Sequence, residues 1–221
     1  MGLSFFDRVV IATDAAEVVE ACRGFGAEVH LTRPEHPSGT DRVAEVVCDP
    51  EFAGFDIVAN VQGDEPLLSE SQVAAAVALV RDGDWQVGTV ATPIRSRDEW
   101  TAESVVKVVR RDDGAALLFT RAPVPHPRGQ APDFASGLYL RHIGLYVYRR
   151  DALLRWVALP EGALERVERL EQLRPLAAGI SIGVALAEAA PAGVDTLEDA
   201  RRVEAIIRNP PRSIPREYIA P

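Results

Sequence analysis

Residues 55–66 read FDIVANVQGDEP, an apolar run that ends at a glycine followed by two carboxylates. The run 55–61 is apolar through its middle, which is typical of a strand buried on both faces of a sheet. In open α/β sheets, ligands bind beyond the carboxyl ends of the strands. Gly63 lets a ligand approach the backbone closely, and the Asp64 carboxylate suits a Mg²⁺–nucleotide site. The plainer alternative is a Gly-Asp turn that leads into the next helix.

The rest of the chain alternates short β-branched runs with helical patterns in the same way. Such alternation predicts an α/β fold with a mixed, mostly parallel sheet and helices on both faces. The sequence contains no internal repeat or dividing linker, so we expect one domain over residues 1–208 and a proline-rich tail without fixed structure over 209–221. The predicted strands are 8–13, 28–31, 55–61, 87–91, 105–110, 117–120, 142–149 and 182–185.

Periodicity and capping patterns locate the helices. Three pairs of residues have the spacing of a capping box, which predicts a helix start at each. These pairs are Asp14 with Glu17, Ser69 with Gln72, and Thr196 with Asp199. An apolar stripe at helical spacing predicts one further helix, with Glu171 and Gln172 on it. The stripe consists of Leu164, Val167, Leu170, Leu173 and Leu176.

The charge and cysteine content exclude several classes of protein. The 221 residues contain 24 Lys and Arg against 33 Asp and Glu, for a net charge of -9. An acidic chain of this kind does not present the basic face that nucleic acid requires. The two cysteines, Cys22 and Cys48, are expected to be reduced, and no apolar run is long enough to span a membrane. We therefore expect a cytoplasmic globular protein with no nucleic-acid or membrane partner.

Two carboxylates follow predicted strands and are candidate metal ligands. Asp64 follows the strand 55–61, and Asp195 stands just before the capped helix that Thr196 begins. Two carboxylates at adjacent strand ends can share Mg²⁺ with the phosphates of a substrate. On its own, Asp195 is more simply a residue that favours the helix dipole.

Several polar side chains near strand ends are candidates for recognising a small polar ligand. Arg121 ends the strand 117–120, and its guanidinium suits bidentate binding of a carboxylate. His142 and Tyr146 share one face of the strand 142–149, with Ile143, Leu145 and Val147 on the other. Their side chains can hydrogen-bond hydroxyl groups. Taken singly, surface Arg and half-buried aromatic residues explain this pattern, and Glu171 and Gln172 fit a solvated helix face.

Taken in order, these segments resemble the 3-deoxy-manno-octulosonate (Kdo) cytidylyltransferases, the CMP-Kdo synthetases. The likeness extends from about Asp7 to Arg208, and the fold expected from it is a Rossmann-like nucleotidyltransferase fold. The segments that carry it are Ala12 to Asp14, Thr32 to Arg42, Asn60 to Pro66, Val106 to Val109, Phe119 to Ala122, Arg141 to Tyr148, Leu170 to Arg174 and Gly193 to Thr196.

The resemblance implies that CTP and Kdo react to give CMP-Kdo and pyrophosphate for lipopolysaccharide assembly, in a homodimer. Asp64 and Asp195 match the family's catalytic Mg²⁺ carboxylates. Arg121 is the expected partner of the sugar carboxylate. Ser38 and Gly39 match the loop beside the cytosine, and Gln62 matches a position shared by nucleotide and sugar. The sugar-binding positions are matched by Gln62, Arg121, His142, Tyr146, Glu171 and Gln172.

The chain departs from the family at its beginning. Family members start with a strand and a loop, PARxxSxRLPxKPL, that wraps the CTP phosphates, and this sequence contains neither. We therefore expect the first βα unit, roughly 30 to 40 residues, to be missing. The absent strand would leave backbone groups beside residues 8–13 and 55–61 unpaired, and the 221-residue chain is expected not to turn over CTP.

Two alternatives to the Kdo enzyme stay open from the sequence. One is an inactive homologue that binds a sugar acid or oligomerises without CTP turnover. The other is a CMP-activating enzyme for a different acidic sugar, such as 8-amino-Kdo or a sialic acid. A dehydrogenase is disfavoured because no GxGxxG follows a predicted strand.

Overall fold

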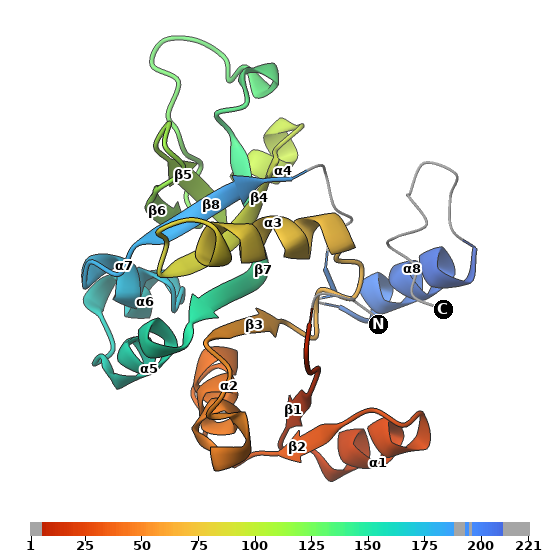
Figure 1. Ribbon diagram of the computed structural model, residues 1–221. Helices are drawn as coiled ribbons and strands as arrows, with labels where there is room; N and C mark the ends of the chain where they lie inside the picture. Colours follow the sequence, from red (N-terminus) through yellow and green to blue (C-terminus); the bar gives the residue numbers. More distant parts are fainter. Residues whose placement is uncertain (1–5, 188–192, 195, 210–221) are drawn as a thin grey trace.

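The computed structural model describes residues 6–187, 193–194 and 196–209, and it places them in an α/β fold built around one long strand (Figure 1). This strand is β7 (Leu140–Arg149), and β4 (Val87–Pro93) pairs along one of its edges. The other edge is shared by β5 (Lys107–Arg110) near the start of β7 and by β3 (Ile57–Val61) near its end. The outer strands are β6 (Ala116–Thr120), next to β5, and β8 (Ile182–Leu186), next to β4.

The expected mixed sheet is confirmed, but its pairs are more often antiparallel than the sequence predicted. Among the strands described, β4 and β8 run parallel, whereas β7 is antiparallel to β3, β4 and β5. The antiparallel pairs arise because β7 runs opposite to β3, β4, β5 and β8, which share one direction. A short turn also joins β5 to β6, and a hairpin of that kind can only pair antiparallel strands.

The alternation predicted for the central strand is confirmed, because its two faces contribute to two different cores. Ile143, Leu145 and Val147 pack under α3 (Glu70–Arg81). Tyr146 and Tyr148 pack on the opposite face, against Trp156 of α5 (Arg150–Ala158). Helices therefore cover both faces of the sheet.

A small second sheet contains β1 (Ile11–Thr13) and β2 (Val29–Leu31), which run parallel and are joined by α1 (Ala16–Gly24). The helix α2 (Gly39–Cys48) contacts both β1 and β3. Among the described residues, β1 pairs only with β2 and β3 only with β7, so each has one edge without a strand partner. The strand 55–61 was expected to be buried on both faces, yet most residues of β3 are half-buried.

The remaining elements are short, and one ends the described chain. They are η1 (Pro50–Phe52), α4 (Arg97–Thr101), η2 (Phe134–Ser136), α6 (Ala163–Glu168), α7 (Leu173–Ala177) and α8 (Leu197–Arg208). No helix among the described residues is long and apolar enough to cross a membrane. The tail expected over residues 209–221 lies outside the described residues except for Asn209.

Candidate active site

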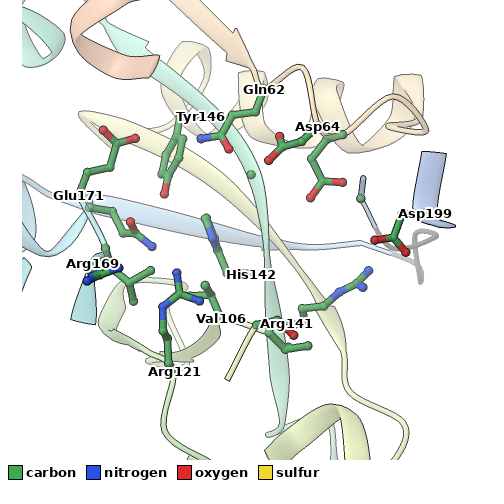
Figure 2. A pocket seen from close by; sticks show the side chains of 17 residues that line it. Gln62, Asp64, Val106, Arg121, Arg141, His142, Tyr146, Arg169, Glu171 and Asp199 are labelled. Carbon is green, nitrogen blue, oxygen red and sulfur yellow. The ribbon is translucent and has the colours of Figure 1, made fainter. Parts of the chain in front are cut away.

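A cavity of about 670 Å³ opens where the two strands on the shared edge of β7 diverge (Figure 2). Val61 at the end of β3 pairs with Leu145, and Lys107 at the start of β5 pairs with Arg141. The residues of β7 between these pairs therefore face the gap between two strand ends. The described residues that line the cavity are Gln62, Asp64, Glu65, Ser104, Val105, Val106, Arg121, Arg141, His142, Gly144, Tyr146, Arg169, Leu170, Glu171, Gln172, Gly193 and Asp199.

Two glycines allow the cavity wall to close tightly around the segment that follows β3. A Cβ on Gly144 would lie 2.9 Å from Oε1 of Gln62, and one on Gly193 would lie 2.7 Å from the carbonyl of Asp64. Contacts this short do not occur between a real Cβ and its neighbours, so a side chain at Gly193 would displace the Asp64 backbone and one at Gly144 would shift the Gln62 side chain. Because Gly144 and Gly193 have no side chain, Gln62 and Asp64 can lie close to their backbone.

The cavity has a mainly basic end and a mainly acidic end. In Figure 2, Arg121 and Arg169 lie to the left together with Glu171, whereas Asp64 and Asp199 lie to the right together with Arg141. Neutral hydrogen-bonding side chains, including His142, lie between them. A ligand with a carboxylate at one end and a metal-bound phosphate at the other would match this distribution of charge.

The acidic end fits a magnesium ion by the chemistry of its oxygen donors. Mg²⁺ binds one or two protein carboxylates together with substrate phosphates, and Asp64 is a carboxylate on the cavity wall. The amide of Val194 donates to the carbonyl of Asp64 at 2.7 Å, which ties the segment before Asp195 to Asp64. Asp195 itself lies outside the described residues, so its predicted pairing with Asp64 stays a prediction.

At the basic end, backbone carbonyls hold the guanidinium of Arg121. Its Nε donates to the carbonyl of Glu168 at 3.0 Å, and its Nη1 donates to the carbonyl of Glu103 at 2.9 Å. The Glu168 carboxylate also accepts from the Arg121 amide at 2.9 Å and from the Thr120 hydroxyl at 2.6 Å. These two donors hold the pKa of Glu168 below its usual value. Arg121 is therefore fixed before any ligand arrives.

A buried lysine shapes the turn that supplies one of those carbonyls. Lys107 is fully buried, and its Nζ donates to the carbonyls of Ala102 at 2.9 Å and Val105 at 2.7 Å. Burial lowers the pKa of this ammonium group, and the nearby charge of Arg121 lowers it further. The turn that Lys107 closes contains Glu103, the partner of Arg121, and Ser104, which lines the cavity.

The middle of the cavity is formed by two aromatic side chains of β7. The ring of His142 contacts that of Tyr146 at 5.3 Å and that of Phe119 at 5.0 Å between centroids. Burial lowers the pKa of His142 to about 3, so the imidazole is neutral. Burial raises the pKa of the Tyr146 phenol well above its usual value, which keeps its proton in place. Both groups are therefore available to a ligand as neutral hydrogen-bonding partners.

The helix predicted over the Leu164–Leu176 stripe is wrong, because the chain breaks it at Arg169. This residue adopts a left-handed conformation, with φ 54° and ψ 49°, and it ends α6 before α7 begins. The break turns Leu170, Glu171 and Gln172 towards the cavity instead of towards solvent. A continuous helix would have left both polar side chains on a solvated face.

The start of α2 meets the cavity at Glu171. The hydroxyl of Thr40 donates to Oε1 of Glu171 at 2.9 Å, and Ser38 caps the helix by accepting from the Asp41 amide. Burial raises the pKa of Glu171, although the hydroxyls of Ser38 and Thr40 oppose that shift. Ser38 and Gly39 are not among the described residues that line the cavity, so the structure places them beside Glu171 rather than in the wall.

The structure brings together seven of the ten residues that the sequence singled out. They are Gln62, Asp64, Arg121, His142, Tyr146, Glu171 and Gln172. Sequence reasoning missed Glu65, Arg141, Arg169 and Asp199, which also line the cavity. Glu65 and Arg141 stand directly beside predicted site residues, and this adjacency could have indicated that they line the same cavity. No pattern in the sequence indicated that Arg169 lines the cavity, because a continuous helix was expected there.

The described residues contain one other group with metal-ligand chemistry, formed by His30, Asp49 and Glu51. None of the three lines the cavity, and Glu51 is already bound by Arg8 at 2.8 Å. This group is not a competing candidate for the site.

An α/β sheet with a cavity at its strand ends, lined by carboxylates and guanidinium groups, is typical of enzymes that bind nucleotides or other charged ligands. The family model described as "Cytidylyltransferase" matches residues 3–182, and the chain belongs to this family. The likeness inferred from sequence motifs is thereby confirmed.

Individual relatives and solved structures show which members of the family this chain is similar to. A 3-deoxy-manno-octulosonate cytidylyltransferase from Gemmatimonas aurantiaca is 50% identical over 199 residues, which cover 89% of this chain and 76% of the relative. One of the same name from Syntrophotalea carbinolica is 48% identical over 209 residues, covering 91% and 82%. A solved CMP:2-keto-3-deoxy-manno-octonic acid synthetase complexed with CTP has a TM-score of 0.82 at 39% identity, covering 91% of this chain and 80% of that one. An inositol-1-phosphate CTP transferase from T. maritima, at 12% identity and a TM-score of 0.56, shares the fold.

Proposed function

We propose that this protein joins the cytidylyl group of CTP to Kdo, giving CMP-Kdo and pyrophosphate for lipopolysaccharide assembly. The observation that carries the proposal is the distribution of charge in one cavity, with Arg121 at one end and Asp64 at the other. Kdo is an acidic sugar and CTP binds as a metal complex, so each end has a natural partner. Relatives that share half of the sequence carry the name of this activity.

The basic end and the middle of the cavity would bind the sugar. The fixed fork of Arg121 would take the Kdo carboxylate, because two parallel N–H groups match two carboxylate oxygens. Hydrogen bonds to the sugar hydroxyls would come from neutral or carboxylate side chains around it. These are Gln62, His142, Tyr146, Glu171 and Gln172.

The cytosine would lie towards the start of α2, and the phosphates would lie towards the acidic end. Ser38 and Gly39 begin α2 and would contact the cytosine, while Gln62 faces both substrates. Asp64 and Asp195 would hold Mg²⁺, which when bound neutralises phosphate charge at the acidic end. Family membership and the donor chemistry of Asp64 support this assignment.

The reaction is an in-line displacement at phosphorus. The anomeric hydroxyl oxygen of Kdo forms a bond to the α-phosphorus of CTP, the bond to the β-phosphate oxygen breaks, and pyrophosphate leaves. The cavity contributes by fixing the orientation of the attacking hydroxyl through Arg121 and the neutral hydrogen bonders. Because the His142 and Tyr146 rings are neutral, they orient the sugar without adding charge beside its carboxylate.

The test is to incubate the purified protein with CTP, Kdo and Mg²⁺ and to follow pyrophosphate release and CMP-Kdo by phosphorus NMR. We expect release that requires both substrates and that does not occur when ATP replaces CTP. Parallel reactions with 8-amino-Kdo and a sialic acid identify the preferred sugar. Faster release with either of these sugars would contradict the assignment of Kdo.

A second candidate is a protein that binds the sugar acid without turning over CTP. The free edges of β1 and β3 favour it, because those strands lie next to α2, where the nucleotide is expected. Calorimetry separates the two candidates. Binding of both Kdo and Mg²⁺–CTP supports the enzyme, whereas binding of Kdo alone supports the second candidate.

We propose further that the protein is a cytoplasmic homodimer with no nucleic-acid or membrane partner. The net charge of -9 supports the absence of a nucleic-acid partner, and the resemblance to the CMP-Kdo synthetases supports the dimer. Light scattering on the purified protein measures the oligomeric state, and a monomer at micromolar concentration would contradict the dimer.

A further inference from the structure

The hydroxyl of Thr89 makes two hydrogen bonds at the back of the cavity. Its Oγ1 lies 2.7 Å from the carbonyl oxygen of Leu145 and 2.9 Å from Nε2 of His142. Thr89 lies on β4, where it pairs with Tyr146 along one edge of β7, and it is fully buried. Water therefore does not compete for either contact.

Counting protons gives each of these hydrogen bonds a direction. A carbonyl oxygen only accepts, and a hydroxyl has a single proton to donate. The 2.7 Å contact between two oxygens thus requires the Thr89 proton to point at Leu145. The contact with His142 is then satisfied only if Nε2 carries a proton and donates it to Thr89.

An irregularity in the sheet makes the Leu145 carbonyl available for this purpose. Thr89 pairs with Tyr146, whereas the next residue, Val90, pairs with Ile143. Two residues of β7, Gly144 and Leu145, are therefore extra in the register. A bulge of this kind disrupts the ladder locally and re-aims the groups beside it.

The other ring nitrogen of His142 faces the cavity. A neutral imidazole carries one proton, so a proton on Nε2 leaves Nδ1 with a free lone pair. Burial lowers the pKa of His142 to about 3, which keeps the ring in this neutral form. Nδ1 has no hydrogen-bond partner in the described part of the chain, and it is not among the buried unpartnered atoms there. Because His142 lines the cavity, Nδ1 is open to a ligand.

We propose that Thr89 is a positioning residue that fixes His142 as the Nε2–H tautomer, so that Nδ1 is an obligatory hydrogen-bond acceptor in the cavity. The site then selects a sugar acid that directs a hydroxyl donor at Nδ1 and disfavours one with a deoxy or O-alkyl group there. This inference rests on the proposed binding of Kdo at this site.

The tautomer is measured directly, and without substrate, by long-range ¹H–¹⁵N spectra of the ¹⁵N-labelled protein at neutral pH. The chain has four histidines, and comparison with His142→Gln assigns the signals of His142. We expect a protonated Nε2 and an unprotonated Nδ1. A protonated Nδ1 would overturn the proposal.

Three variants separate positioning from packing. Thr89→Val removes the hydroxyl and keeps the shape, and we expect a mixture of tautomers and about tenfold weaker Kdo binding, with CTP binding unchanged. Thr89→Ser keeps the hydroxyl and should restore a single tautomer and affinity within about threefold of the wild type. Thr92→Val makes the same change at another buried position of β4 and controls for loss of packing.

The outcomes distinguish the proposal from the function on which it rests. If Thr89→Val keeps the wild-type tautomer and affinity, Thr89 has no positioning role. If Thr89→Val loses stability without a change in the ¹⁵N signals, and Thr89→Ser does the same, the role is structural and the proposal fails. A wild-type Nε2–H tautomer that depends on Thr89, in a protein that does not bind Kdo, supports the positioning role and overturns the proposed sugar.

Discussion

Arg121 is bound to Glu168 at both its backbone and its side chain. The Arg121 amide donates to the Glu168 carboxylate at 2.9 Å, and the Arg121 Nε donates to the Glu168 carbonyl at 3.0 Å. These bonds connect the end of β6 to the end of α6, two segments far apart in the chain. The orientation of the guanidinium is thus set by the fold, which lowers the entropic cost of binding a carboxylate.

Replacing Arg121 tests its assignment to the sugar. Arg121→Ala should raise the KM for Kdo by about 10- to 100-fold and leave the KM for CTP nearly unchanged, because only the carboxylate loses its partner. Arg121→Lys keeps the charge but lacks the planar fork, so we expect an intermediate effect. Steady-state kinetics with each substrate varied in turn measures both constants. A rise in the CTP constant instead would assign Arg121 to the nucleotide.

Asp64 is expected to be essential for turnover and dispensable for folding. Asp64→Asn removes the charge that would hold Mg²⁺ but keeps the size of the side chain, so turnover should fall by at least about 100-fold. The thermal melting temperature should stay close to that of the wild type. Asp151→Asn, at an exposed position in the first turn of α5, is the matched control. Unchanged activity of Asp64→Asn would remove Asp64 from the metal site.

The half-buried, neutral imidazole of His142 should make the protein less stable in acid. Its pKa is about 3 in the folded chain and returns to about 6.5 on unfolding. Between these values the unfolded chain binds the extra proton, so the free energy of unfolding decreases as the pH falls from about 6.5. One proton gives a slope of up to about 1.4 kcal/mol per pH unit.

Urea unfolding of the wild type and of His142→Gln, at several pH values between about 7 and about 5, measures this slope. We expect the variant to have a shallower dependence than the wild type, since the group that takes up the proton is gone. His126→Gln removes an exposed histidine and should leave the slope unchanged. Equal slopes for all three proteins would contradict the burial of a neutral His142.

The left-handed backbone at Arg169 predicts different results for two replacements that both remove its side chain. Arg169→Gly should be about 1 kcal/mol more stable than Arg169→Ala, because glycine adopts positive φ without a steric penalty. Thermal or urea unfolding measures this difference. Both variants should bind Kdo more weakly than the wild type by a similar factor, since both lose a positive charge from the basic end. Equal stabilities would mean that the break between α6 and α7 does not require this conformation.

The sequence predicted the elements whose signal is local. The capping boxes at Ser69 and Thr196 are both present, because each consists of two side chains within one helical turn. The third predicted box, at Asp14, was wrong. The helix begins instead at Ala16, and the Asp14 carboxylate lies 3.3 Å from Arg42 of α2. A competing charge from another element was not visible in the local pattern.

In the candidate site, too, the residues with a local sequence pattern were predicted, and those positioned by distant contacts were not. Residues such as Gln62 and His142 were found because they stand at strand ends or on the polar face of an alternating strand. The role of the 169–172 segment was hidden, since its leucine spacing fits a continuous helix. The break at Arg169 depends on contacts that α6 and α7 make elsewhere, including the ion pair between Glu165 and Arg174 at 2.8 Å. No local rule connects that ion pair with a turn at 169.

The edge of β3 that has no strand partner in the described part of the chain has a consequence for hydrogen exchange. Along a strand, successive amides point to opposite edges, so only every second amide of β3 can donate to β7. The amides between them face the free edge, and we expect them to exchange with solvent orders of magnitude faster than their neighbours. An extended segment that pairs with this edge would replace that alternating pattern with uniform protection along the whole strand.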